Sequence, residues 1–144
     1  MNSTKGTVVL GVAASDAHAV ANHLIAYSLR AAGYDVVNLG TCTPVSEFAA
    51  AARQRPETLA VIIGSLNGHV HEDLRDLREA EIECPVIVGG NLSVGSQKDS
   101  SALDRLYALG VDHILSQPDQ LPPLLERIAA QRAIEAVPVV VAAS

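Results

Sequence analysis

The sequence predicts a single α/β domain built around a doubly wound parallel sheet of five strands. Short apolar runs rich in valine and isoleucine alternate with longer segments whose apolar residues recur at helical spacing, the pattern of repeated strand–helix units. Apolar residues make up 49% of the chain but aromatic residues only 3%, which is typical of buried parallel strands. A length of 144 residues suits one domain with a well-buried core.

Two strand–helix units begin the chain. The β-branched run TVVLGVA at 7–13 predicts a central strand, and apolar residues at helical spacing predict a helix over 17–32 that Gly33 ends. The run YDVVNLG at 34–40 predicts the second strand. A second helix starts at Pro44, because proline suits the first helical position.

Three further units complete the chain. The expected strands cover 59–65, 85–90 and 112–116, and the expected helices cover 71–80, 101–109 and 119–132. Pro122 and Pro123 fall in the first turn of the last helix, where a missing amide donor matters least. We expect one folded domain over 1–133 and a flexible C-terminal tail over 134–144.

Five such strands favour the flavodoxin-like order 2-1-3-4-5, a Rossmann-like arrangement that binds ligands at the carboxyl ends of strands 1 and 3. The rule indicates the loops at 15–18 and 64–69, and the loop at 89–95 follows on the same edge. Polar or glycine-rich segments occupy all three loops, namely SDAH, GSLNGH and GGNLSVG. Their coincidence at one edge favours a binding site there.

Each loop also has an ordinary structural interpretation. Asp16 could cap the first helix, which would leave His18 as an exposed residue of the first turn. The Asn-Gly pair at 67–68 favours a turn, and Gly89 and Gly90 could simply end a strand. The three loops together therefore carry more weight than any one of them.

Other kinds of site are not supported. His69 and His71 form a His-x-His pair with no third ligand nearby, and a solvated pair is the simpler interpretation. The chain has no phosphate loop, no dinucleotide fingerprint, and no Ser-His-Asp or Cys-His arrangement that spacing could support. Cys42 and Cys84 are isolated, which argues against a zinc site or a disulfide framework and suits a reducing cytoplasm.

The charge balance excludes two classes of partner. Ten Lys and Arg residues stand against 16 Asp and Glu residues, giving a net charge of −6. Nucleic acids and anionic membrane surfaces require clustered basic residues, so we expect neither as a partner. No apolar stretch approaches the roughly 20 residues that span a bilayer.

At the three loops the sequence resembles the cobalamin-binding domain family, and most closely the small (sigma) subunits of glutamate mutase. That family has an Asp-x-His-x-x-Gly motif after strand 1, a Ser-x-Leu segment after strand 3 and a Gly-Gly segment after strand 4. The corresponding segments here are SDAHAVAN, GSLNGH and VGGNLSVG. The similarity covers roughly 7–130 and includes TVVLGV and AGYDVVNLGTCTP.

The resemblance implies that His18 binds the cobalt of adenosylcobalamin from below, with Asp16 accepting a hydrogen bond from the other ring nitrogen. The displaced nucleotide tail would enter a slot between the sheet and the first helix. The resemblance assigns cofactor contacts to Ser15, Asp16, Ala17, His18, Ala19, Gly64, Ser65, Leu66, Gly89, Gly90, Asn91, Leu92, Ser93, Val94 and Gly95.

Two positions depart from the family pattern. Ala21 replaces the closing glycine of the first motif and adds a methyl group where the first helix meets the slot. Gly64 replaces the first serine after strand 3 and removes a hydroxyl that could bond the benzimidazole. Both changes bear on affinity for the nucleotide tail more than on cobalt ligation.

The resemblance implies a radical mutase that rearranges glutamate to 3-methylaspartate. The substrate would bind to a separate, larger barrel-type (epsilon-like) subunit in a heterotetramer, so we assign no catalytic residue to this chain and expect it to be inactive alone.

Three alternatives stay open. A corrinoid carrier for methyl transfer usually has a helical cap before the domain, whereas the first strand here starts near residue 7. A receiver-like signalling domain needs a phospho-accepting aspartate after strand 3, where this chain has Gly64 and Ser65. The third is a degenerate relative that has lost its cofactor, which the alanine at position 21 keeps open.

Overall fold

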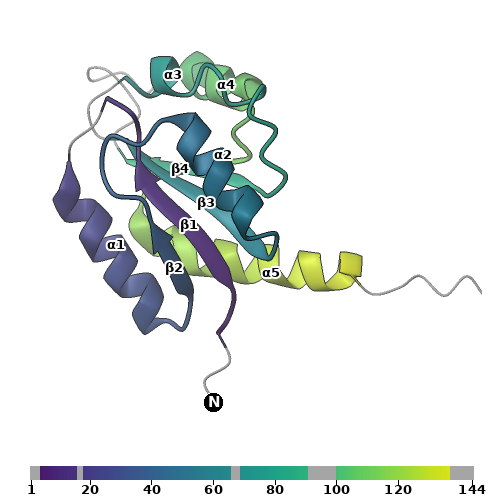
Figure 1. The fold of residues 1–144 in the computed structure, drawn as a ribbon. Helices are drawn as coiled ribbons and strands as arrows, with labels where there is room; N and C mark the ends of the chain where they lie inside the picture. The colour runs from purple at the N-terminus through teal and green to yellow at the C-terminus, as the bar shows by residue number, and fades with distance from the viewer. Residues whose placement is uncertain (1–3, 16–17, 66–68, 91–99, 137–144) are drawn as a thin grey trace, which may run out of the picture.

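The computed structural model describes residues 4–15, 18–65, 69–90 and 100–136. Within them, five parallel strands form one sheet in the order β2-β1-β3-β4-β5, which confirms the expected topology (Figure 1). The strands are β1 (Thr7–Val12), β2 (Asp35–Asn38), β3 (Thr58–Ser65), β4 (Val86–Gly90) and β5 (His113–Leu115).

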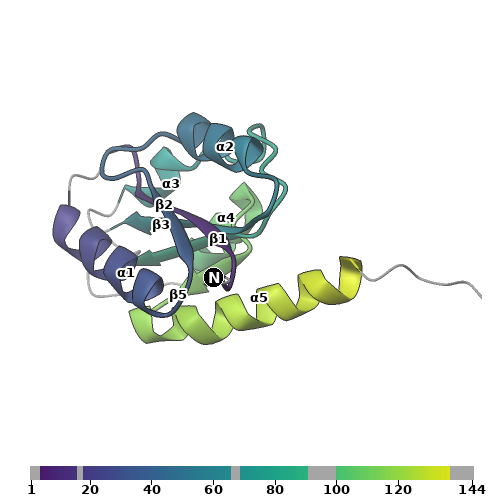
Figure 2. The same ribbon diagram turned by 60° about the horizontal axis from the view of Figure 1, so that its bottom comes forward.

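Helices cover both faces of the sheet. They are α1 (Ala19–Ala31), α2 (Val45–Gln54), α3 (Val70–Asp73), α4 (Ser100–Leu109) and α5 (Leu121–Ala136), with a 3-10 turn η1 (Pro118–Gln120) directly before α5. Helices α1 and α5 pack on one face and α2, α3 and α4 on the other (Figure 2).

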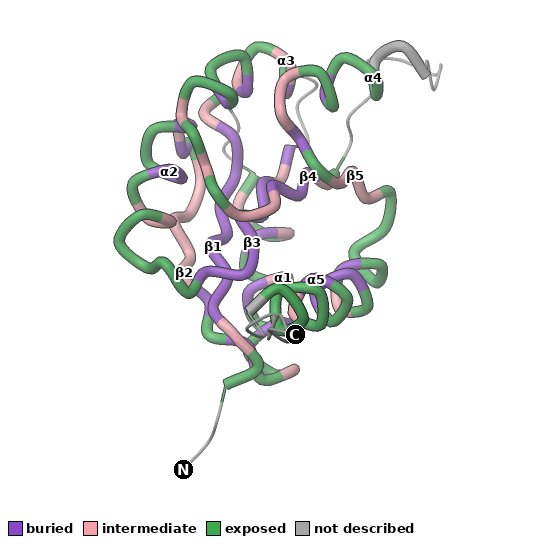
Figure 3. Tube along the Cα trace, turned by 90° about the vertical axis from the view of Figure 1, so that its right-hand side faces the viewer, coloured by how far each residue is buried: buried purple, intermediate pink, exposed green. Residues whose placement is uncertain are grey.

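The alternation of side chains along the central strands produces two apolar cores. Val8 and Leu10 of β1 pack toward α1 and α5, whereas Val9 packs toward the face that holds the fully buried Phe48 of α2. All six residues of β1 are buried, and the central strands form the buried middle of the molecule (Figure 3). Both faces are covered, so the strands carry continuous apolar runs rather than alternating ones.

The third helix is shorter than the sequence predicted. We expected a helix over 71–80, but α3 ends at Asp73 and the chain continues in turns. The N–H of Leu77 bonds the carbonyl of Leu74, three residues back, instead of continuing the α-helical pattern. This tighter winding lets Leu74 and Leu77, which are 1% and 3% exposed, both face the core.

Helices α2 and α5 also have ends that differ from the predicted ones. Pro44 is the N-cap residue of α2 and not its first helical residue, so the helix begins at Val45, one residue later than predicted. The last helix continues to Ala136, past the expected end at 132 and past the boundary placed at 133, while 137–144 lies outside the described residues. Arg132 anchors this extension, because its Nη1 donates to the carbonyl of Thr58 (2.6 Å) and its Nη2 to that of Pro56 (2.7 Å).

Replacing Arg132 by alanine removes these bonds and should lower the free energy of unfolding by about 1 kcal/mol. Chemical denaturation followed by circular dichroism measures the change. Gln131→Ala is the matched control, because the Gln131 side chain bonds only one turn along the same helix, to Glu135. Equal stabilities of the two variants would contradict the anchoring role.

Candidate functional site

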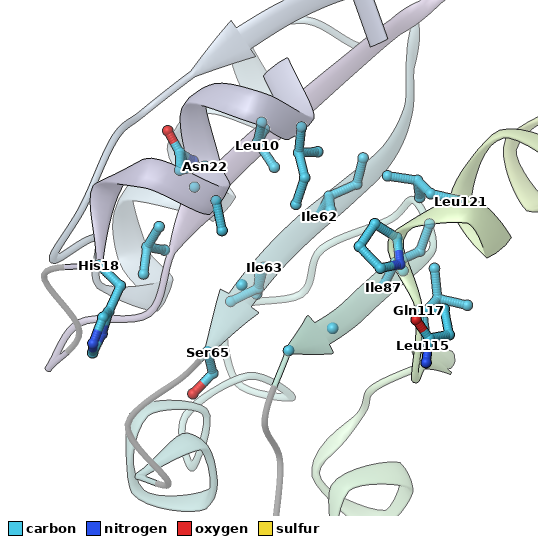
Figure 4. A pocket seen from close by; sticks show the side chains of 18 of the residues that line it. Leu10, His18, Asn22, Ile62, Ile63, Ser65, Ile87, Leu115, Gln117 and Leu121 are labelled. Atoms are coloured by element: carbon cyan, nitrogen blue, oxygen red, sulfur yellow. The ribbon is translucent and has the colours of Figure 1, made fainter. Parts of the chain in front are cut away.

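A cavity of about 270 Å³ opens at the carboxyl edge of the sheet, between α1 and the start of α5 (Figure 4). This is the edge at which the strand order reverses, where the topology rule expects a ligand. Its apolar lining comes from β1, β3 and β4, from α1, and from the segment that joins β5 to α5: Leu10, Ile62, Ile87, Ala21, Ile25, Leu115, Pro118 and Leu121.

Two glycines keep the floor of the cavity open. Gly64 of β3 pairs with Gly89 of β4, and by alternation they share the face of Ile62 and Ile87. A Cβ on Gly64 would approach only the carbonyl oxygen of Gly11, at 3.8 Å, and one on Gly89 would come no closer than 3.7 Å to Leu115. Packing within the protein therefore does not require glycine at either position; the missing side chains leave space for a ligand.

Gly90 is glycine for a different reason. Its backbone has φ +118, which side-chain-bearing residues rarely adopt, and a Cβ there would collide with the carbonyl oxygen of Ser65. The close approach of β4 to the end of β3 thus depends on this residue.

Two polar side chains are buried at the cavity. Ser65 is 0% exposed and Asn22 is 4% exposed, and both belong to the lining. Ser65 Oγ and Asn22 Nδ2 have no hydrogen-bond partner among the described residues. Buried polar atoms are almost always paired, so these two atoms indicate that a ligand with polar atoms completes the site.

His18 lies at the mouth of the cavity, immediately before α1 (Figure 4). It is the N-cap residue of that helix, with extended backbone, and its exposed side chain makes no capping hydrogen bond. Asp16 is therefore not the N-cap residue of α1, contrary to the ordinary structural interpretation of this loop. Its imidazole lies beyond the end of α1, on the side of the molecule where β3 ends (Figure 4).

The other expected site residues are placed as follows. Ser15 and Ala19 flank His18 outside the cavity lining, and Ser15 Oγ donates to Asp73 Oδ2 at 2.7 Å, which ties the loop after β1 to α3. Asp16, Ala17, Leu66, Asn91, Leu92, Ser93, Val94 and Gly95 lie outside the described residues.

The remaining candidates stay apart from the cavity. His69 Nδ1 lies 3.9 Å from Glu72 Oε2 on the surface, and no group of three metal-ligating side chains occurs in the described part of the chain. Burial raises the pKa of the Cys84 thiol, which disfavours a reactive thiolate there. No helix in the described ranges is both long and apolar enough to cross a membrane.

Sequence reasoning missed Asn22 and the segment from Leu115 to Leu121. Asn22 follows His18 by four residues, so helical spacing places the two on the same side. A single amide on a helix face that also carries the apolar Ile25 could have indicated a buried polar contact. The segment before α5 carries no recognised binding motif. It was missed because only the tertiary fold brings it to the cavity.

The sequence profile of the B12 binding domain matches residues 6–114. The chain belongs to the B12-binding domain family. This B12-binding chain is 40% identical over 120 residues to the glutamate mutase sigma subunit of Halobacterium salinarum, an alignment that covers 81% of this chain and 80% of that one. It is 38% identical over 120 residues to the glutamate mutase sigma subunit of Carboxydothermus hydrogenoformans, covering 80% and 86%. The resemblance predicted from the sequence is thereby confirmed.

Solved structures agree on the fold of this B12-binding domain. The methanol:cobalamin methyltransferase complex MtaBC from Methanosarcina barkeri matches with a TM-score of 0.70 and 27% identity, over 89% of this chain and 48% of that chain. A signal receiver domain from Mycobacterium tuberculosis matches with a TM-score of 0.59 at 13% identity, over 89% of this chain and 98% of that one, and shares the fold alone.

Alanine substitution of the two neighbouring glycines of β4 should change stability by different amounts. Gly90→Ala should lower the free energy of unfolding by about 2–3 kcal/mol, because it combines a strained backbone with a clash against Ser65. Gly89→Ala is the matched control and should change stability by less than about 1 kcal/mol, since its Cβ meets only ordinary contacts. Urea denaturation distinguishes the two, and equal losses would show that the strain at Gly90 is not specific.

Proposed function

We propose that this chain is the adenosylcobalamin-binding subunit of a glutamate mutase-like enzyme, which rearranges glutamate to 3-methylaspartate together with a separate catalytic subunit. The observation that carries the proposal is an apolar slot between α1 and the sheet that ends at an exposed histidine. Such a slot suits the flat nucleotide base of a corrinoid, and a histidine at its mouth suits cobalt.

The described residues fit the cofactor. Imidazole nitrogen is a suitable ligand for a transition metal, and His18 presents it at the carboxyl edge of the sheet. The open floor at Gly64 and Gly89 admits a planar ring, and apolar walls exclude water from it. Asn22 offers a polar atom for a heteroatom of such a ring.

This chain's residues would hold and orient the cofactor. His18 would bind the cobalt through an imidazole nitrogen, and Asp16 would accept a hydrogen bond from its second ring nitrogen, which would fix the tautomer. Asn91 to Gly95 would close around the far end of the tail. When bound, adenosylcobalamin supplies the homolytic cleavage of its cobalt–carbon bond, and the protein supplies binding and orientation.

The composition of the cavity supports a separate substrate subunit. The described side chains that line it include no lysine or arginine, so they offer no cation to pair with the two carboxylates of glutamate. We therefore assign the substrate to a larger, barrel-type subunit of an epsilon-like kind in a heterotetramer, and we propose that the chain alone has no turnover. The sigma-subunit names of its relatives support a separate subunit for the substrate. We also propose a reducing cytoplasm as the compartment.

A corrinoid carrier for methyl transfer is the second candidate, supported by the 27% identity to the methanol:cobalamin methyltransferase complex. The 34–40% identities to sigma subunits favour the mutase. Likeness to receiver domains at 11–19% identity is a likeness of fold only.

Replacing His18 by alanine should abolish cobalt ligation by the protein. Purified wild-type chain mixed with cobalamin should show the visible spectrum of a histidine-ligated corrinoid whose nucleotide base has left cobalt. The variant should lack that spectrum, and His23→Ala, an exposed histidine on α1, should retain it. A wild-type spectrum in the His18 variant would contradict the assignment.

Filling the floor of the slot should exclude the nucleotide tail. Gly89→Ala should weaken cobalamin binding roughly tenfold, because an added methyl group overpacks a fitted space. Binding of cobinamide, which lacks the tail, should stay unchanged. Parallel titrations followed by absorbance measure both affinities, and an equal loss for the two corrinoids would contradict a tail-binding slot.

A further inference from the structure

A chain of two hydrogen bonds leads from the backbone to the wall of the cavity. The N–H of Gly40 donates to Oδ1 of Asn38 (3.0 Å), and Nδ2 of Asn38 donates to Oδ1 of Asn22 (2.8 Å). Asn22 lies on α1 and lines the cavity (Figure 4). Asn38 is the last residue of β2 and is not part of the lining. These two hydrogen bonds thus join the loop at Gly40, strand β2 and helix α1.

The chemistry of these groups fixes the orientation of the Asn22 amide. A backbone N–H can only donate, so the atom of Asn38 that meets Gly40 is its oxygen, and its NH₂ group must face Asn22. Asn22 must then offer its own oxygen to Asn38. Nδ2 of Asn22 is left over as a donor, and the amide cannot turn over without breaking the bond to Asn38.

This leftover donor needs an acceptor. Asn22 is only 4% exposed, and its Nδ2 has no partner among the described residues. Its neighbours in the lining include Ile25 and Leu10, which offer no acceptor in their side chains. Burying an unpaired amide hydrogen is unfavourable, so this donor favours a ligand that places an acceptor atom against it.

We infer that Asn22 is a ligand-binding residue whose Nδ2 donates a hydrogen bond to the buried part of the ligand, and that Asn38 is the positioning residue that holds it as a donor. This inference rests on the proposed function and names the contact. The acceptor is an in-plane ring nitrogen, such as that of a benzimidazole whose nitrogen has left cobalt. Asn22 therefore favours the displaced tail over the cobalt-bound one and discriminates against corrinoids without a nitrogenous base.

The first test compares cobalamin with cobinamide. Asn22→Leu keeps the approximate volume but removes the donor, and it should weaken cobalamin binding about tenfold while leaving cobinamide binding unchanged. Ser28→Leu, a polar-to-leucine change on the exposed face of α1, is the control and should bind both corrinoids as wild type does.

The second test reverses the amide without touching the cavity. In Asn38→Asp, the new carboxylate accepts from Gly40 and from Nδ2 of Asn22, so Asn22 turns its oxygen toward the cavity. Cobalamin binding should fall at least tenfold, because two acceptors then face each other, and cobinamide binding should again stay unchanged. In the Asn22→Leu background the aspartate should cause no further loss, since it acts only through Asn22.

The outcomes separate the two levels of the proposal. If the wild-type chain binds both corrinoids and both variants bind cobalamin as tightly as the wild type does, the role of Asn22 is overturned. The proposed function would not be affected by that result. Equal losses for cobalamin and cobinamide would also overturn it, because they would show a structural effect rather than a contact with the tail. Failure of the wild type to bind either corrinoid would overturn the proposed function together with this inference.

Discussion

The pairing of Gly64 on β3 with Gly89 on β4 is the constraint on which the site depends. In a sheet buried on both faces, register is strongly specified, because a slip of one residue would move Ile62 and Ile87 to the wrong core. Once that register is set, two residues without side chains lie next to each other on the face shared by α1 and α5. The sheet therefore has a gap in its apolar surface at the edge where the strands end.

The walls of this gap come from opposite ends of the chain. Helix α1 follows β1 directly, whereas the other wall is formed by the segment that leaves β5 and enters α5. Each wall packs against the sheet through its own apolar residues, such as Leu29 of α1 and Leu125 of α5. The space between them is thus maintained by the core on either side and does not require a ligand to hold it open.

Much of this arrangement follows from the sequence, because it is encoded locally or by topology. Apolar runs mark the strands, and the strand order then places the segments at His18, Gly64 and Gly89 along one edge. The length of the last helix was not predictable in this way, since Arg132 bonds carbonyls 74 to 76 residues earlier. Asn22 was missed for a similar reason: its partner Asn38 lies on another element, and only their contact shows that the amide is a fixed donor.

The two buried polar side chains at the cavity differ in how firmly their polarity is set. A serine hydroxyl rotates and can donate or accept, so Ser65 can adapt to whichever atom faces it. The amide of Asn22 cannot, because the backbone N–H of Gly40 fixes Asn38 and Asn38 fixes Asn22. A fixed donor favours a ligand that presents an acceptor atom and disfavours one that presents a donor, whereas a hydroxyl that can rotate accommodates either. In the contact that we propose, chemical selectivity at this cavity would therefore originate on β2, in an asparagine that lies outside the cavity lining.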